Sequence, residues 1–252
     1  MMQNIYDDPE FFTGYSEMRR SVGGLEEAGE WHAFREMLPD LAGKRVLDLG
    51  CGFGWHCRYA RKKFASSVLG IDLSQMMLAR AREMTDDPRI EYRRMAIEDA
   101  EYGASQFDVV ISSLAFHYIE RFDLVCRKVA GCLPPGGSFV FSVEHPIFTS
   151  LAEQDWCRGS EGELRHWPVD NYQMEGVRHT HFIADRVIKY HRTVATYLNS
   201  VIAAGLRIVR VSEPEPPREL LAKYPDWKDE SRRPMFLIIA AEADAVDTSN
   251  WA

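Results

Sequence analysis

The feature that most constrains this fold is residues 45–54, which read R-V-L-D-L-G-C-G-F-G. An apolar run typical of a buried strand ends in three glycines at alternate positions, and a helical pattern follows. Glycine accepts unusual backbone angles and has no side chain to keep a ligand away from the backbone. The helix after the turn would direct unpaired N–H groups and the positive end of its dipole toward the turn. We therefore predict a site for a small cofactor that carries an anionic group.

Two kinds of cofactor fit such a turn. A dinucleotide site prefers the spacing G-x-G-x-x-G, whereas this chain has G-x-G-x-G followed by the bulky Trp55 and His56. Asp72 ends a second apolar run, residues 67–72. A carboxylate there can accept both ribose hydroxyls of NAD or of an adenosyl group. The spacing suits a pyrophosphate poorly, which counts against an NAD(P)-dependent oxidoreductase, the alternative that this turn leaves open.

The motif V-L-D-L-G-C-G-x-G at 46–54, with G-I-D-L-S at 70–74, resembles class I S-adenosylmethionine-dependent methyltransferases of the small-molecule, ubiquinone/menaquinone-methyltransferase-like type. The resemblance covers about residues 44–241 in element order. It implies S-adenosyl-L-methionine as cofactor, S-adenosyl-L-homocysteine as product, and methyl transfer to an oxygen or nitrogen of a small metabolite. A non-catalytic adenosyl-ligand-binding protein on the same fold is a second alternative.

The order of the apolar runs agrees with this family. Strands are predicted at about 45–49, 67–72, 90–95, 107–112, 138–143, 206–211 and 236–240, with helices at about 26–38, 55–65, 74–84, 121–132 and 192–204. Continuous apolar strands separated by helices indicate an α/β fold, a Rossmann-like, doubly wound, mostly parallel sheet covered by helices on both faces. The resemblance implies seven strands, the last antiparallel. We expect an N-terminal helical lid at 1–43 and a methyltransferase domain at 44–252, with an inserted substrate lid at about 147–191.

Composition narrows the function further. The chain has 252 residues, 46% of them hydrophobic, and a formal net charge of −8, which disfavours a nucleic-acid partner because phosphate contacts need a basic face. No apolar run reaches the length of a membrane span, and the first residues lack a signal-peptide pattern. The five scattered cysteines fit a reducing compartment. We expect a cytoplasmic monomer or homodimer that acts on a small molecule.

Ligands of open parallel sheets lie beyond the carboxyl ends of the strands. The resemblance places Gly50, Cys51 and Gly52 against the methionine part of the cofactor and Asp72 at the ribose. The remaining predicted cofactor contacts are Leu73 after strand two, Ile97 and Glu98 after strand three, Ser113 and Leu114 after strand four, and Tyr15 and Arg19 of the N-terminal lid. Ala96 stands where many relatives carry the aspartate that reads adenine.

Three titratable residues are candidates for catalysis. The sequence S-S-L-A-F-H-Y at 112–118 lacks the motifs of DNA base methyltransferases and resembles the S-x-L-x-x-H-x pattern of small-molecule enzymes, which places His117 near the sulfonium. Glu144 and His145 end strand five, beside the same cleft. A histidine can take a proton at neutral pH, so His117 or His145 is the predicted general base and Glu144 its support.

The insertion contains a possible hairpin that turns at Ala184-Asp185, with His179 and His181 on one side of its first strand. Two histidines could begin a metal site, but no third ligand is evident, so no metal is predicted. Its aromatic residues make the insertion the predicted wall of the substrate pocket.

Overall fold

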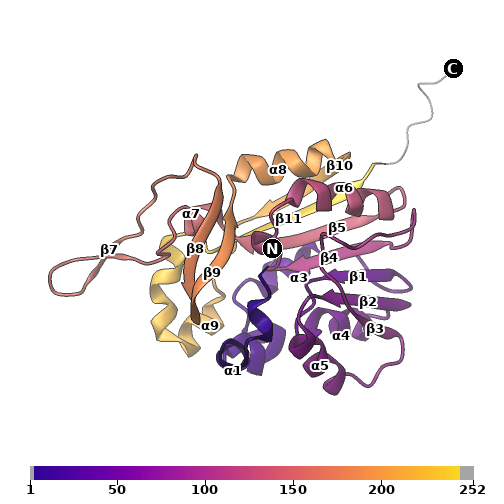
Figure 1. Cartoon of the computed structure of the whole chain (residues 1–252), viewed down its shortest axis with the longest axis horizontal. Coiled ribbons are helices and arrows are strands. Elements are labelled where there is room, and N and C mark those ends of the chain that lie inside the picture. The colour runs from indigo at the N-terminus through magenta and orange to yellow at the C-terminus, as the bar shows by residue number, and fades with distance from the viewer. Residues whose placement is uncertain (1–2, 245–252) are drawn as a thin grey trace.

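The computed structural model describes residues 3–244, which contain a seven-stranded sheet in the order β10-β11-β5-β4-β1-β2-β3 (Figure 1). Its strands are β1 (Arg45–Leu49), β2 (Ser67–Asp72), β3 (Ile90–Arg94), β4 (Val109–Ser113), β5 (Ser138–Glu144), β10 (Leu206–Ser212) and β11 (Phe236–Ala243). Strands β1 to β5 pair in parallel, and β11 runs antiparallel to both β5 and β10. The predicted doubly wound sheet with an antiparallel last strand is therefore confirmed.

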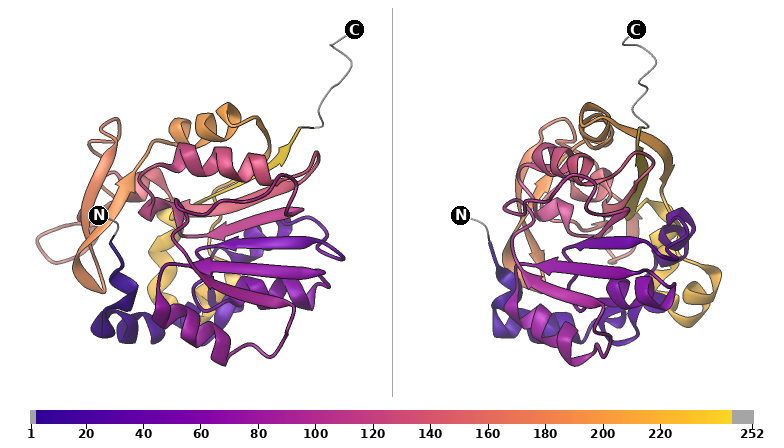
Figure 2. Two further views of the ribbon diagram at one scale, coloured as in Figure 1. Left: turned by 45° about the vertical axis from the view of Figure 1, so that its right-hand side comes forward. Right: turned by 90° about the vertical axis from the view of Figure 1, so that its right-hand side faces the viewer.

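Helices cover both faces of this sheet (Figure 2). One hydrophobic core lies under α6 (Phe122–Cys132) and α8 (Val194–Ala203), and the other under α3 (Trp31–Met37), α4 (Trp55–Lys62) and α5 (Gln75–Glu83). Strand β4 supplies both cores, since Val110 packs into the first and Val109 and Ile111 into the second. Alternate side chains of a strand point to opposite faces, so an unbroken apolar run is what a sheet covered on both faces requires.

The glycine turn after β1 needs its glycines for steric reasons. Gly50 has φ +76°, and a Cβ there would lie 2.5 Å from the Cβ of Ala115. Gly54 has φ +71°, and a Cβ there would lie 2.1 Å from the hydroxyl of Tyr92. Gly52 has φ +51° and nothing within 4 Å of its Cβ position, so this part of the turn faces open space. The turn is thus packed on one side and open on the other.

Some element boundaries differ from the prediction. Strand β4 begins at Val109, and the Asp108 carboxylate just before it accepts from the backbone N–H of Arg45 at 2.8 Å. The helix expected at 26–38 is interrupted, and a short 3-10 helix, η2 (Gly24–Glu27), precedes α3. Ser74 caps the N-terminus of α5, where its hydroxyl accepts from Met77 N at 3.1 Å.

Three segments lie around the carboxyl ends of the parallel strands (Figures 1 and 2). The N-terminal segment, residues 3–22, forms η1 (Ile5–Asp7), α1 (Pro9–Ser16) and α2 (Arg19–Val22). The insertion forms α7 (Pro146–Thr149), β6 (Cys157–Arg158), β7 (Leu164–His166) and the hairpin β8 (Gly176–Phe182) and β9 (Ala184–His191). The C-terminal segment, residues 213–235, forms α9 (Arg218–Lys223) and η4 (Pro225–Arg232). The hairpin turns at Ile183, one residue earlier than predicted, with φ +63°.

The N-terminal segment is attached to both sides of the cleft. The Gln3 amide donates to Arg186 O at 3.1 Å and accepts from Ile188 N at 2.8 Å, which binds it to β9. Asp7 accepts from the Ser74 hydroxyl at 2.6 Å and from Met76 N at 3.0 Å, which binds it to the start of α5. By contrast, α3 packs in the second core, so the two parts of residues 1–43 occupy different places.

Asp48 of β1 is buried below the glycine turn, where its carboxyl oxygen accepts from the Cys57 thiol at 3.2 Å. Burial raises the pKa of Asp48 to about 7, so the folded chain retains a proton that the unfolded chain releases near pH ~4. This group therefore lowers the free energy of unfolding as pH rises through that window.

We expect Asp48→Asn to remove this cost. The measured quantity is the free energy of unfolding of the variant minus that of the native chain. This difference should increase by about 2–3 kcal/mol between pH 5 and pH 8, because the native chain loses stability as pH rises and asparagine has no proton to lose. Urea unfolding of both proteins at the two pH values measures the difference, in which the titrations of all other groups cancel. The same difference at both pH values would show that Asp48 is ionised throughout.

Candidate functional site

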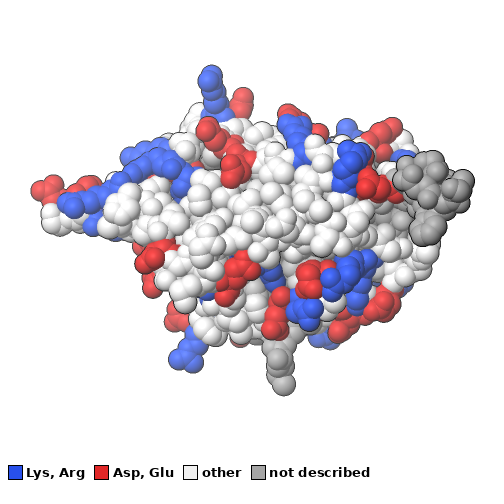
Figure 3. Space-filling model, turned by 90° about the horizontal axis from the view of Figure 1, so that it is seen from above, with Lys and Arg blue, Asp and Glu red and all other residues white. Residues whose placement is uncertain are grey.

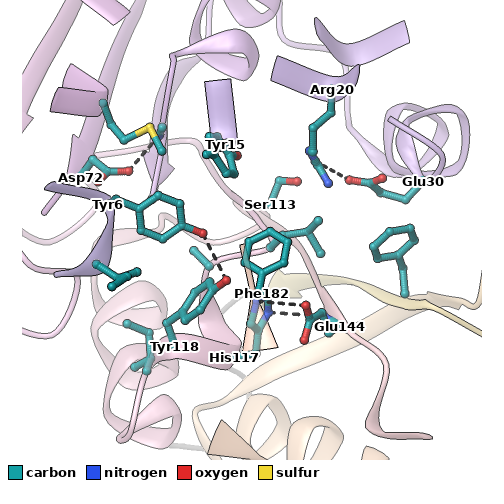
Figure 4. A pocket seen from close by; sticks show the side chains of 18 of the residues that line it. Tyr6, Tyr15, Arg20, Glu30, Asp72, Ser113, His117, Tyr118, Glu144 and Phe182 are labelled. Carbon is teal, nitrogen blue, oxygen red and sulfur yellow. Dashed lines mark hydrogen bonds and ion pairs between the residues drawn. The ribbon is translucent and has the colours of Figure 1, made fainter. Parts of the chain in front are cut away.

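A cavity of about 740 Å³ lies at the carboxyl ends of the strands (Figure 4). It is lined by twelve of the fourteen predicted site residues: Tyr15, Arg19, Gly50, Gly52, Asp72, Leu73, Ile97, Glu98, Ser113, Leu114, His117 and Glu144. The fold therefore brings together residues from the first half of the sheet, the N-terminal segment and β5. Cys51 and His145 lie outside this lining.

Cys51 and His145 have other surroundings. Cys51 lines a smaller adjoining pocket, and burial raises the pKa of its thiol to about 11, which keeps it protonated. His145 is buried and forms the N-cap of α7, where Nδ1 accepts from Ile147 N at 3.0 Å. Its Nε2 lies 2.7 Å from the carboxylate of Glu213. Both ring nitrogens of His145 thus have partners, and neither faces the cavity.

Asp72 fixes the shape of the cavity at the end of β2. One carboxyl oxygen accepts from Gly52 N at 2.9 Å, and the other accepts from Ser74 N at 2.9 Å. These bonds connect the glycine turn to the start of α5. Burial raises the pKa of Asp72, while the two backbone N–H donors act against that shift. Each carboxylate oxygen has a second lone pair, so Asp72 can still accept from a diol in the cavity.

The loop after β3 supplies a free acceptor. Ala96 and Ile97 line the cavity with apolar side chains. One carboxyl oxygen of Glu98 is buried and has no hydrogen-bond partner within the described chain. Burial raises the pKa of Glu98. A buried polar atom without a partner is costly, and an amino group bound beside it would satisfy it.

An ion pair between a half-buried arginine and a buried glutamate also lines the cavity. Arg20 donates to Glu30 at 2.7 Å, and both side chains line the cavity (Figure 4). The neighbouring Arg19 has its guanidinium over the ring of Tyr224 at 3.9 Å and pairs with Asp226 at 3.2 Å. Sequence reasoning selected Arg19 and missed Arg20, because only the distant partner Glu30 distinguishes two adjacent arginines.

Tyr6 is a further residue that the sequence analysis missed. Its hydroxyl lies 3.1 Å from that of Tyr118, and its ring packs edge-on against Tyr15 with centroids 5.3 Å apart. These contacts place the N-terminal segment over the middle of the cavity (Figure 4). The aromatic character of residues 6–15 was the available signal. The C-terminal segment was also missed, and it lines the cavity through Pro214, Pro216, Trp227, Glu230 and Met235.

The end of β5 carries the remaining charged group. Glu144 accepts from the buried Lys189 of β9 at 2.6 and 2.9 Å and from Gln154 at 3.2 Å. Burial raises the pKa of Glu144, but Lys189 and His117 outweigh that effect and hold it below its ordinary value. His117 Nε2 lies 4.0 Å from a Glu144 oxygen, too far for a hydrogen bond.

His117 is buried, and burial lowers its pKa to about 4, so the ring is neutral at pH 7. Its Nδ1 accepts from Glu144 N at 3.4 Å. In a neutral imidazole only one nitrogen accepts, so this contact leaves the proton on Nε2. His117 can therefore donate a hydrogen bond through Nε2.

The histidines of the hairpin are far from forming a metal site. His179 and His181 are both exposed, and His181 pairs with Asp185 at 2.7 Å. Within residues 3–244, no group of three or more His, Cys, Asp or Glu side chains could hold a metal ion.

The surface carries mixed charges. On the face shown in Figure 3, positive and negative side chains are interspersed, and no continuous basic band crosses the coloured residues. Of the helices within residues 3–244, none is long and apolar enough to cross a membrane.

The cavity fits an adenosyl-amino-acid cofactor. Asp72 offers acceptor lone pairs for ribose hydroxyls, and Glu98 offers an unpaired buried oxygen for an amino group. Gly52 leaves the turn open to a ligand, and Arg20 with Glu30 carries the charges that complement an amino-acid zwitterion. Leu114, in the positive-φ region at +54°, adds backbone strain of the kind that clusters at functional sites.

Known proteins share this sequence and this fold. The methyltransferase domain family matches residues 47–141. A Listeria monocytogenes protein assigned as an S-adenosylmethionine-dependent methyltransferase is 50% identical, with 88% of this chain and 100% of that chain covered and a TM-score of 0.84. An S-adenosylmethionine-dependent methyltransferase of Mesorhizobium loti is 46% identical, with coverage of 87% and 100% and a TM-score of 0.82.

A Haemophilus influenzae protein of uncharacterized function is 35% identical over 249 residues, 94% of this chain and 96% of that protein. These similarities extend over nearly the whole chain and include its fold. They set aside the oxidoreductase and the non-catalytic alternatives. The chain belongs to the S-adenosylmethionine-dependent methyltransferases and uses S-adenosylmethionine as its cofactor.

Proposed function

We propose that this methyltransferase moves the methyl group to an oxygen or nitrogen of a small metabolite bound between the cofactor and Glu144. The observation that carries this proposal is the continuity of one cavity, about 740 Å³, from Asp72 at the end of β2 to Glu144 at the end of β5. That volume is in the range of pockets for small ligands, which bury most of the ligand surface.

In this proposal, the cofactor half of the cavity is formed by the ends of β1 to β4. Asp72 accepts from the ribose, Glu98 and the backbone of Ile97 read the adenine, and Gly50, Gly52 and Ser113 contact the methionine part. Arg20 binds the carboxylate of that part. The strained Leu114 and the neighbouring Leu73 form apolar contacts with the adenosyl group.

The bound cofactor supplies an activated methyl group on sulfonium sulfur. The residues of the chain then align the acceptor and exclude water. Tyr6, Tyr15 and Phe182 cover the cavity, and His117 donates through Nε2. Because His117 has a pKa of about 4 and lacks a free acceptor nitrogen, we assign it a positioning role in place of the general-base role that the sequence suggested.

A direct assay tests the proposed function. Purified protein should bind S-adenosylhomocysteine at one saturable site in a calorimetric titration and transfer a labelled methyl group to members of a small-metabolite pool. S-adenosylhomocysteine should inhibit that transfer, and NAD(H) should not compete. Tight cofactor binding with transfer only to RNA or protein acceptors would overturn the small-metabolite assignment.

A further inference from the structure

We propose that the methyl acceptor is an amine attached to an apolar body, and that its nitrogen is held by the carboxylate of Glu144. This inference rests on the proposed function and names the substrate class of the same cavity. Two observations support it: carboxylates, not cations, face the cavity near Glu144, and apolar side chains line the cavity there.

The acceptor end is the part of the cavity next to Glu144. Two carboxylates line the cavity, and the cations that pair with them do not. Glu144 lines the cavity, whereas its partner Lys189, whose side chain is 1% exposed, does not. The same holds for Glu230, which lines the cavity and pairs at 2.9 Å with Arg233 outside the lining. Groups that accept hydrogen bonds thus face the ligand, and the ammonium and guanidinium groups point away from it.

No lining cation of the described chain is left for an anionic acceptor. Arg19 pairs with Asp226, Arg20 with Glu30, and Arg121 with Asp123 at 3.0 Å. Arg20 is proposed above to bind the cofactor, so a carboxylate or phosphate acceptor would have to share Arg19 or Arg121 with its acidic partner, and near Glu144 it would meet a like charge. The arrangement favours a donor group over an anion.

Glu144 retains hydrogen-bonding capacity toward the cavity. A carboxylate has about four acceptor lone pairs. Lys189 takes two of them, at 2.6 and 2.9 Å, and Gln154 takes a third, at 3.2 Å. His117 is too distant, at 4.0 Å, to take the remaining lone pair. An N–H of the acceptor can occupy that position, with its own lone pair directed at the methyl group.

The charge movement of the reaction favours nitrogen at this position. The amine reacts as the neutral base, after its ammonium form has released one proton to water. The nitrogen lone pair forms the N–C bond, the C–S bond of the sulfonium breaks with its electron pair left on sulfur, and the product is an ammonium that retains the remaining N–H proton beside Glu144. Positive charge therefore develops on nitrogen beside Glu144, and a fixed carboxylate stabilises it. A neutral alcohol would instead need a base, and both His117 and Glu144 have pKa values lowered below their ordinary range.

The walls indicate an apolar body for this amine. Phe182 lies beside Glu144 in Figure 4, and Phe236 of β11 is the register partner of Glu144. Both line the cavity, as do Ile188, Met235 and Pro216. Aromatic rings supply large contact areas and attract a developing cation through their faces. Lys189 already uses this attraction, since its ammonium lies 5.0 Å from the centroid of the Phe182 ring.

The first experiment compares matched acceptors. Each set contains an amine, an alcohol and a carboxylic acid on one body, such as 2-phenylethylamine, 2-phenylethanol and phenylacetate, extended to indole and branched alkyl bodies. We expect the amine of any reactive set to accept labelled methyl best. Preference for an alcohol or an acid, or no transfer to any amine of the panel, would overturn the inference. S-adenosylhomocysteine binding is measured on the same protein, so loss of the cofactor function is recognised separately.

The second experiment removes the negative charge from Glu144. In Glu144→Gln we expect kcat for the amine to fall about 10²-fold or more, with unchanged affinity for S-adenosylhomocysteine, because the lost interaction acts on the developing charge. The matched control is Glu213→Gln. Glu213 contacts His145 just after β5 and does not line the cavity, so this variant should retain activity. Unchanged kcat in folded Glu144→Gln would contradict the role of Glu144.

Glu144→Gln leaves Lys189 buried without a charged partner and could fail to fold. The double variant Glu144→Gln with Lys189→Met removes both charges and retains similar volume. It should fold and bind S-adenosylhomocysteine, yet show the same loss of kcat for amines. Full activity of this double variant would likewise overturn the inference.

Discussion

Replacing Asp72 by alanine is expected to weaken S-adenosylhomocysteine binding about 10²–10³-fold. The carboxylate is placed to accept two ribose hydroxyls, and a hydrogen bond to a charged group contributes about 1.5–3 kcal/mol. The substitution also removes the two 2.9 Å bonds that hold Gly52 and Ser74. The glycine turn and the N-terminus of α5 would then lose their common anchor. Calorimetric titration with S-adenosylhomocysteine measures the effect.

Two further variants show whether charge or shape is responsible. Asp72→Asn retains one acceptor oxygen and the side-chain volume, so we expect an intermediate loss of about tenfold. Asp99→Ala removes an exposed acid that lies outside the cavity lining and should bind like the native chain. Native affinity in a folded Asp72→Ala protein would remove Asp72 from the binding site.

The parts of the site that could be predicted from the sequence are those carried by local motifs. Gly50, Gly52 and Asp72 follow directly from two apolar runs, because a parallel sheet brings the ends of adjacent strands to one edge. The same rule placed Ser113 and Glu144, which are the last residues of β4 and β5. The sequence pattern is therefore sufficient to predict a site residue when the position of that residue depends only on the strand that precedes it.

Residues that depend on contacts between distant segments could not be found in this way. Tyr6 reaches the cavity because Gln3 and Asp7 bind to β9 and α5, far along the chain. Lys189 breaks the general expectation that lysine is exposed, and its burial makes sense only when Glu144 is placed opposite. No element was predicted between the strands at about 206–211 and 236–240, so the helices α9 and η4 of the C-terminal segment were not found.

Arg20 gives the clearest case, because the burial of its partner Glu30 makes a large effect on stability predictable. Glu30 is 2% exposed, and one of its carboxyl oxygens has no hydrogen-bond partner in the described chain. In Arg20→Ala this carboxylate would remain buried without a cation. Breaking a buried pair in this manner costs about 3–5 kcal/mol, so we expect the free energy of unfolding to fall by that amount. Urea unfolding at pH 7 measures it.

The double variant Arg20→Leu with Glu30→Gln separates folding from binding. Removing both charges should restore most of the lost stability, because no uncompensated charge is left in the interior. Cofactor binding should nevertheless stay weak if Arg20 contacts the amino-acid part. The informative comparison is S-adenosylhomocysteine against 5′-methylthioadenosine, which has the same adenosyl group and no amino-acid part.

We expect the native chain to bind S-adenosylhomocysteine more tightly than 5′-methylthioadenosine. In the double variant this ratio of affinities should fall about 10- to 100-fold, which is the contribution of one hydrogen bond to a charged group. Affinity for 5′-methylthioadenosine should stay close to native, since Asp72 and Glu98 are untouched. If both ligands weaken equally, the ion pair acts only by shaping α2 and the glycine turn. If neither weakens, the carboxylate is bound elsewhere, and the buried pair serves stability alone.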